Sequence, residues 1–300
     1  MNVLIWATTF GADLWSFARY LDQQPEVTIK VVMDDPERFR RQGVHDLFPL
    51  DVDLVKRRFW HHALGVPGFD ADITIMDNRT PFLRTAPKAL MLWHGFGWKG
   101  PDSEDDLWWL HRSLRRTWGD ARAPNSDFAW QCFGPWDQKH RTEVTGLHPN
   151  NCHLLGAASH DDLRTPIDRT RAQPYYPFDV ATTPTVLVAP TWHYGEVFEH
   201  WGTDADLLDR LVRHVGQRGA RDYRAMLDDL AARHDHVMLK YKDRYPDNYL
   251  DLQVADALIT NYSSIANLFY ATGRPTIHVY PVADADEAFM SRTYTFAGVL

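Results

Sequence analysis

The sequence predicts an α/β protein made of two domains, each built on a parallel sheet. Short apolar runs alternate with stretches of helical periodicity along the chain. This alternation breaks once, between residues 161 and 185, where four prolines interrupt it and predict a linker. The length of 300 residues also favours about two domains. We therefore place a first domain at residues 1–181 and a second at residues 182–300.

The first domain is expected to alternate strands and helices from its first residues. Its opening run, VLIWAT, precedes a polar turn and a helix in which Leu14, Phe17, Ala18 and Leu21 recur at helical spacing. Residues 52–64 are helix-like, and residues 103–118 predict a helix whose acidic start suits the N-terminal dipole. The remaining apolar runs predict strands at residues 27–33, 72–77, 89–93, 128–133 and 152–155.

The second domain repeats the pattern. Strands are expected at residues 185–192, 236–241, 255–260 and 275–280. Helices are expected at residues 206–215, 222–233 and 263–273, and Gly273 closes the last of them.

Composition and charge exclude several classes of protein. The chain has 40 acidic and 32 basic residues, a net charge of −8 and a pI near 6.0, which argues against a nucleic-acid partner and makes any phosphate site local. The two cysteines, Cys132 and Cys152, lack metal-ligand spacing and are too few for a disulfide framework. The start has no signal-peptide pattern and no 18 apolar residues run together, so we expect a cytoplasmic protein.

His94 is the first candidate catalytic residue. It follows directly from a buried-looking strand in ALMLWHGFGWKG, where Gly95 would let a ligand approach the backbone and Lys99 supplies a cation. With an ordinary pKa of about 6.5, an imidazole here could take a proton from an acceptor hydroxyl near neutral pH. The alternative is a structural histidine that hydrogen-bonds to backbone.

A second candidate is the turn after the strand at residues 255–260. Asn261 and Tyr262 lead into a helix that begins near Ser263 and Ser264. Unpaired N–H groups at a helix start, with two hydroxyl groups beside them, suit a phosphate. The alternative is that Ser263 only caps the helix.

Two further strand ends carry unusual residues. Thr191, Trp192 and His193 end the first strand of the second domain, where Trp192 could line a pocket or belong to the core. In LKYKDRY, strand alternation places Lys240 and Lys242 on one face, where they could meet a diphosphate or form a solvated edge.

The sequence lacks the motifs of several common enzyme classes. It has no GxGxxG after the first strand, no GxxxxGK[ST], no HExxH and no GxSxG. This weakens an interpretation as a dinucleotide oxidoreductase, a P-loop NTPase, a zincin or an α/β-hydrolase. We assign no metal and no cofactor.

The motifs, in order, resemble those of the CDP-glycerol glycerophosphotransferase family of teichoic-acid-type polymerases and primases. Its Trp-His-Gly-Thr-Pro-Leu-Lys element is similar to residues 93–99, and its Ala-Pro-Thr-Trp element to residues 189–192. Its Asp-x-Leu-Ile-Thr-Asp-Tyr-Ser-Ser element is similar to residues 256–264. The resemblance spans roughly residues 85–285.

This resemblance implies two Rossmann-like domains facing a cleft, the GT-B arrangement, with an acceptor-side first domain and a nucleotide-donor second domain. It implies His94 as catalytic base and a donor diphosphate held near Ser263. The reaction would move a polyol phosphate, glycerol phosphate first, from a CDP-activated donor to an acceptor hydroxyl of a cell-surface polymer or its lipid-linked precursor, releasing CMP. Lys242 stands where the family has a histidine, and Asn261 where it has an aspartate.

Other functions stay open. A GT-B glycosyltransferase or a UDP-sugar epimerase would keep the fold and change the donor. A degenerate, non-catalytic binding module would bind a polyanionic polymer without turnover. A peripheral contact with the inner face of the cell membrane is compatible with a lipid-linked acceptor, although no basic amphipathic helix demands it.

Overall fold

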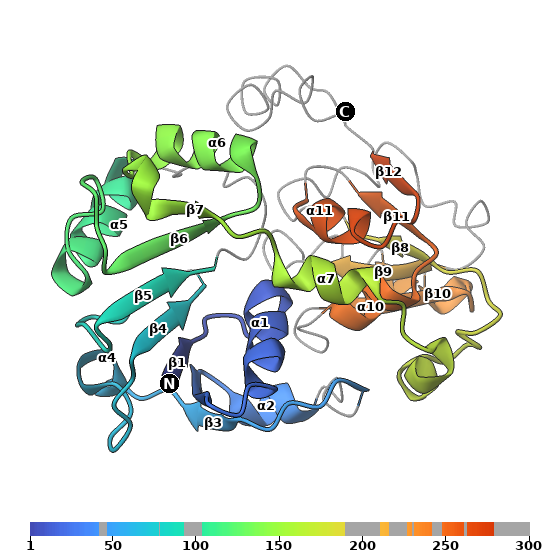
Figure 1. The fold of residues 1–300 in the computed structure, drawn as a ribbon. Helices are drawn as coiled ribbons and strands as arrows, with labels where there is room; N and C mark the ends of the chain where they lie inside the picture. Colours follow the sequence, from blue (N-terminus) through green and yellow to red (C-terminus); the bar gives the residue numbers. More distant parts are fainter. Residues whose placement is uncertain are drawn as a thin grey trace. The chain divides into compact units, whose positions relative to one another are not determined.

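The computed structural model describes residues 1–41, 47–77, 79–92, 104–189, 211–215, 227–229, 231–241, 248–260 and 263–278. The chain divides into two compact units, the first taking in residues 1–159 and the second beginning at His160. Each unit contains one sheet with helices against it, and every described strand pair is parallel (Figure 1). The predicted α/β class with two parallel sheets is confirmed.

The first sheet has seven strands in the order β3-β2-β1-β4-β5-β6-β7. Their bounds are β1 (Asn2–Trp6), β2 (Thr28–Met33), β3 (Asp53–Lys56), β4 (Ile73–Met76), β5 (Lys88–Met91), β6 (Phe128–Cys132) and β7 (Cys152–Leu154). The helices of this region are α1 (Ala12–Asp22), α2 (Pro36–Arg41), α4 (His61–Leu64), α5 (Glu104–Thr117), α6 (Pro135–Thr145) and α7 (Ala158–Arg164), and a 3₁₀ turn, η1 (Pro149–Asn151), precedes β7.

The second sheet has five strands in the order β10-β9-β8-β11-β12. Their bounds are β8 (Val186–Val188), β9 (Leu211–Val215), β10 (Val237–Tyr241), β11 (Ala257–Thr260) and β12 (Thr276–His278). Two helices, α10 (Tyr249–Val254) and α11 (Ile265–Tyr270), and a 3₁₀ segment, η2 (Arg169–Tyr175), belong to the same unit. Residues 227–229 and 231–233 are helical, in agreement with the predicted helix there.

Two helix predictions are wrong, because each of the two stretches contains a short strand. Residues 211–215, predicted as the end of a helix, form β9 and pair with both β8 and β10. The spacing of leucine and valine in LVRHV fits both the helical and the strand periodicity. These residues form a strand because they pair with a neighbouring strand on each side. Residues 52–64 likewise contain β3, an edge strand paired with β2, and only then the single turn of α4.

Four fully buried tryptophans dominate the core of the first unit. Trp6, Trp15, Trp118 and Trp130 each have at most 1% of their surface exposed. Trp6, Trp118 and Trp130 belong to one core cluster with Leu4, Val32 and Met91. Trp60, Trp108 and Trp109 of the same unit are exposed, so the tryptophan content of the sequence serves burial only in part.

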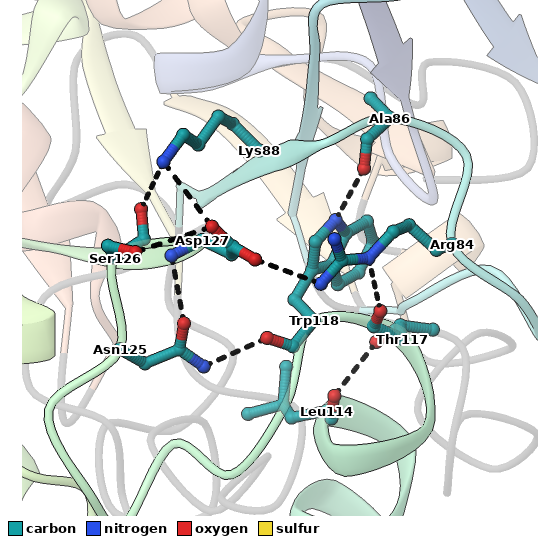
Figure 2. A network of polar contacts seen from close by, with 9 residues as sticks. All are labelled: Arg84, Ala86, Lys88, Leu114, Thr117, Trp118, Asn125, Ser126 and Asp127. Atoms are coloured by element: carbon teal, nitrogen blue, oxygen red, sulfur yellow. Dashed lines mark hydrogen bonds and ion pairs between the residues drawn. The ribbon is translucent and has the colours of Figure 1, made fainter.

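A polar network braces the amino ends of β5 and β6 (Figure 2). The Trp118 indole donates to Ala86 O at 3.0 Å, and Arg84 Nε donates to Thr117 O at 2.8 Å, so the end of α5 is attached to the segment before β5. Asp127 pairs with Arg84 at 3.1 Å and with Lys88 at 3.3 Å. The Arg84 guanidinium and then the Lys88 ammonium hold the pKa of Asp127 below its ordinary value. This edge of the sheet is occupied by structural contacts.

Residues 160–181, which the sequence analysis assigned to the first domain, group with the second unit. Tyr176 is buried, and its hydroxyl donates to Asp251 Oδ1 on α10 at 2.6 Å. Arg169 pairs with Asp256 at 2.6 Å and also donates to the carbonyl of Val254. The segment without clear periodicity is thus held by polar anchors, which periodicity does not reveal.

We expect Tyr176→Phe to lower the free energy of unfolding of the second unit by about 1.5–3 kcal/mol, because its hydroxyl bonds to a buried carboxylate. Burial, followed by the Asp251 charge, raises the pKa of Tyr176 well above its ordinary value of about 10. The folded chain therefore keeps this proton where the unfolded chain loses it, so stability falls as pH rises above about 10.

Urea denaturation at several pH values measures both effects. Tyr20→Phe, at a tyrosine that is 58% exposed, is the matched control and should change stability by less than about 0.5 kcal/mol. An alkaline slope that is identical in wild type and Tyr176→Phe would contradict the assignment.

Candidate functional site

The carboxyl edge of the second sheet contains a topological switch point between β8 and β11. The chain moves outward from β8 to β9 and β10, then returns to place β11 on the other side of β8. In open parallel sheets, ligands bind outside the carboxyl ends of the strands at such a point. β8 and β11 are paired and end side by side at this edge.

Hydrogen bonds tie the ends of β8 and β11 together. Ala189 N donates to Ile259 O at 3.0 Å, and Thr260 Oγ1 donates to Ala189 O at 2.7 Å. Both residues are buried, with exposed fractions of 4% for Ala189 and 1% for Thr260. These bonds hold the ends of β8 and β11 next to each other.

Ser263 and Ser264 precede α11 at this edge, as predicted. Ser263 Oγ accepts a hydrogen bond from Ile265 N at 3.4 Å, and Ser263 O accepts one from Ala266 N at 3.1 Å. Ser264 occupies the N-cap position but makes no side-chain capping bond. Both serines are half-buried. Ser263 thus caps the helix, while the Ser264 hydroxyl is not used in this way.

The other predicted site residues lie outside the described part of the chain. They are His94, Gly95, Lys99, Thr191, Trp192, His193, Lys242, Asn261 and Tyr262. The strands before them are described, and these residues follow the carboxyl ends of β5, β8, β10 and β11. Their individual roles stay predictions.

Lys240 does not face a ligand site, contrary to the expectation that it could meet a diphosphate with Lys242. Its side chain is 5% exposed and its Nζ lies 2.5 Å from Asp251 Oδ1. Nζ also lies 4.7 Å from the centre of the Tyr176 ring. A buried lysine needs a carboxylate partner, and α10 supplies one, so Lys240 joins β10 to α10.

The first sheet has its own switch point, between β1 and β4. Both oxygens of Asp77, which follows β4 directly, accept backbone hydrogen bonds from the β1–α1 loop: Oδ1 from Thr8 N at 2.8 Å and Oδ2 from Thr9 N at 2.7 Å. Asp77 is 1% exposed. Beside it, Leu92 N donates to Met76 O at 2.7 Å, which ties the end of β5 to the end of β4.

A second buried carboxylate, Asp13, holds the other end of the β1–α1 loop. It accepts from Ser159 N at 3.0 Å, from the Ser159 hydroxyl, and from Gln131 Nε2 at 2.8 Å. Between the two anchors, Ala12 has a φ of 45°, in the left-handed region that costs a non-glycine residue about 1–2 kcal/mol. The loop at this switch point is therefore held in one strained shape by two aspartates.

A group of side chains that the sequence analysis missed lies at the same edge. Arg57, just after β3, pairs with Asp34, just after β2, at 2.5 Å. The His62 ring lies 4.6 Å from the Trp6 ring and 4.1 Å from the Phe82 ring. Burial, then the nearby Arg57, lowers the pKa of His62, so the imidazole is neutral at pH 7. Because residues 52–64 were predicted to be a helix, the sequence analysis did not place Arg57 at the end of a strand.

The structure was also searched for metal and membrane features. Within the described ranges, no group of three or more histidine, cysteine, aspartate or glutamate side chains could hold a metal ion. Among the helices of the same ranges, none has the length and apolar character needed to cross a bilayer.

No model of a protein family and no curated protein matches the chain in sequence. Solved structures do match it in fold. The wall teichoic acid polymerase TagF, in a structure with CDPG after a 15 minute soak, superposes with a TM-score of 0.64 at 13% identity over 92% of this chain and 69% of that one.

The UDP-GlcNAc 2-epimerase from Neisseria meningitidis, bound to UDP-GlcNAc, superposes with a TM-score of 0.56 at 13% identity over 96% of this chain and 86% of that one. The UDP-GlcNAc 2-epimerase from Methanocaldococcus jannaschii gives a TM-score of 0.55 at 10% identity over 96% of this chain and 86% of that one. At these identities the likeness shows the fold, which is that of GT-B enzymes.

We expect Asp77→Asn to lower the free energy of unfolding by about 1–3 kcal/mol, because the amide keeps one acceptor and turns an NH₂ group towards a backbone donor. Hydrogen exchange of the Thr8 and Thr9 amides should accelerate together with this loss. Asp70→Asn, at an exposed position, is the control. Unchanged exchange at Thr8 and Thr9 would show that Asp77 does not hold the loop.

Proposed function

We propose that the chain transfers a polyol phosphate, most naturally glycerol phosphate, from a CDP-activated donor to an acceptor hydroxyl, with release of CMP. The acceptor is a cell-surface polymer or its lipid-linked precursor. The observation that carries the proposal is the position of residues 256–264. The stretch that resembles the family's longest motif includes β11, which lies beside β8 at the switch point.

The donor binds at the carboxyl edge of the second sheet in this proposal. Its diphosphate lies at the turn of Asn261, Tyr262, Ser263 and Ser264, with the Lys242 ammonium as a neutralising point charge. The Ser264 hydroxyl supports this role, because it makes no capping bond. Thr191, Trp192 and His193, after β8, line the nucleotide side of the pocket.

The first unit supplies the acceptor side. His94 follows β5, and Gly95 and Lys99 follow it in the same segment. His94 removes the proton of the acceptor hydroxyl as that oxygen attacks the β-phosphorus of the donor. A new P–O bond forms to the acceptor, the bond from the β-phosphorus to the bridging oxygen breaks, and CMP leaves with that oxygen. Positioning and charge stabilisation supply most of the rate in such transfers.

A UDP-sugar enzyme is the second candidate, and a specific observation favours it. The UDP-GlcNAc 2-epimerase from Neisseria meningitidis was solved bound to UDP-GlcNAc, and the superposition covers 86% of that chain. A glycosyltransferase or epimerase would use the same strand ends for a uridine nucleotide. A non-catalytic module that binds a polyanionic polymer is the third candidate, and it predicts no release of CMP.

The proposed reaction belongs in the cytoplasm, at the inner face of the membrane when the acceptor is lipid-linked. Contact with that membrane would be peripheral. The net charge of −8 gives no reason to expect a nucleic-acid partner.

We expect His94→Ala to slow CMP release from CDP-glycerol at least about 100-fold, the contribution of a general base. The affinity for CMP should stay within about twofold, because His94 acts on the acceptor. His153→Ala, at an exposed histidine of β7, is the control and should leave both quantities unchanged. Turnover retained in His94→Ala would eliminate this base.

A further inference from the structure

The first unit contains a hollow that the proposed chemistry does not use. It has a volume of about 840 Å³ and lies between α5 and the carboxyl end of α6. Figure 1 shows both helices on the β5–β7 half of the sheet. The side chains that characterise its lining are Trp108, His111, Arg112, Arg115, Arg116 and Arg122.

The arginines of the hollow are only partly neutralised. Arg115 and Arg122 share one carboxylate, that of Asp120, at 2.9 Å and 3.4 Å. Arg112 and Arg116 have no ion pair within the described part of the chain. Four guanidinium groups in a protein of net charge −8 form a local cationic surface.

Aromatic rings hold the two unpaired arginines. The guanidinium carbon of Arg112 lies 4.7 Å from the centre of the Trp108 ring and 5.7 Å from that of Trp109. That of Arg116 lies 5.8 Å from the Phe82 ring. Stacking on a ring leaves the N–H groups at the guanidinium edge available to an anion, so these arginines are oriented without being neutralised.

The hollow also contains groups that limit what can bind. Glu143 lines it and would repel an anion, but its carboxylate lies 3.9 Å from Lys139 Nζ. His111 Nε2 bonds to Thr145 O at 2.7 Å and joins α5 to α6, while its buried Nδ1 has no partner. The bond from His111 to Thr145 therefore joins the two helices that line the hollow.

We propose that this hollow binds a flexible chain that carries several phosphate groups. Phosphate oxygens would accept paired hydrogen bonds from Arg112 and Arg116, and the carbon segments between phosphates would pack against the Trp108 ring, which is 49% exposed. A concave lining suits a thin chain. The preference for phosphate rests on the hollow alone, whereas the identity of the chain as a polyol phosphate acceptor rests on the proposed function.

The test uses the whole protein and a synthetic glycerol phosphate oligomer, with binding measured by isothermal titration calorimetry. We expect Arg112→Gln/Arg116→Gln to bind the oligomer about tenfold more weakly than wild type, and added salt to weaken wild-type binding. The matched control, Arg40→Gln/Arg164→Gln, removes the same charge from exposed positions elsewhere and should stay within about twofold. Melting temperatures of both variants verify that they fold.

Each outcome decides the proposal. An equal loss in the control variant, no loss in the arginine variant, or no binding of the oligomer to wild type would overturn it. Binding to phosphatidylglycerol vesicles with the same arginine dependence, without binding of the oligomer, would also overturn it in favour of a lipid surface. Arginine-dependent oligomer binding in a protein that does not bind cytidine nucleotides would support the hollow and contradict the proposed function, so the two failures are distinguishable.

Discussion

Parallel pairing is the constraint on which both units depend. A parallel strand needs a crossover that returns the chain to the same starting edge, so every segment that follows a strand begins at the opposite, carboxyl edge. In the second unit, the bond from Thr260 to the carbonyl of Ala189 extends this pairing past the last strand residues. The two segments that carry most of the predicted donor-binding residues consequently begin side by side.

Buried and exposed charged side chains have different roles in this protein. Asp13, Asp77 and Asp251 are at most 3% exposed, and each accepts hydrogen bonds that hold a loop or a helix in place. On α5, Arg115 is exposed and pairs with Asp120, which also pairs with the exposed Arg122 after the helix. The network in Figure 2 braces the amino ends of β5 and β6.

The α/β class was predictable from the sequence because short apolar runs mark most of the strands, although β3 was predicted as part of a helix. β9 was not predictable, since its leucine and valine spacing also fits a helix, and only the neighbouring strands decide it. Asp13 and Asp77 were missed because their partners lie 146 and 69 residues away in the chain. Lys240 was misassigned because alternation identifies a face but not the helix that covers it. Ser263 and Ser264 precede α11, and their role in binding a diphosphate stays a prediction.

Nucleotide preference tests the central claim most directly. The melting temperature of the whole chain would be measured with CMP, CDP-glycerol, UDP and UDP-GlcNAc, because a ligand that binds only the native state stabilises it by about 2.7 kcal/mol at a concentration 100 times its Kd. Our account predicts that the two cytidine nucleotides raise the melting temperature and that the uridine nucleotides leave it unchanged. A rise with uridine nucleotides alone would contradict polyol phosphate transfer.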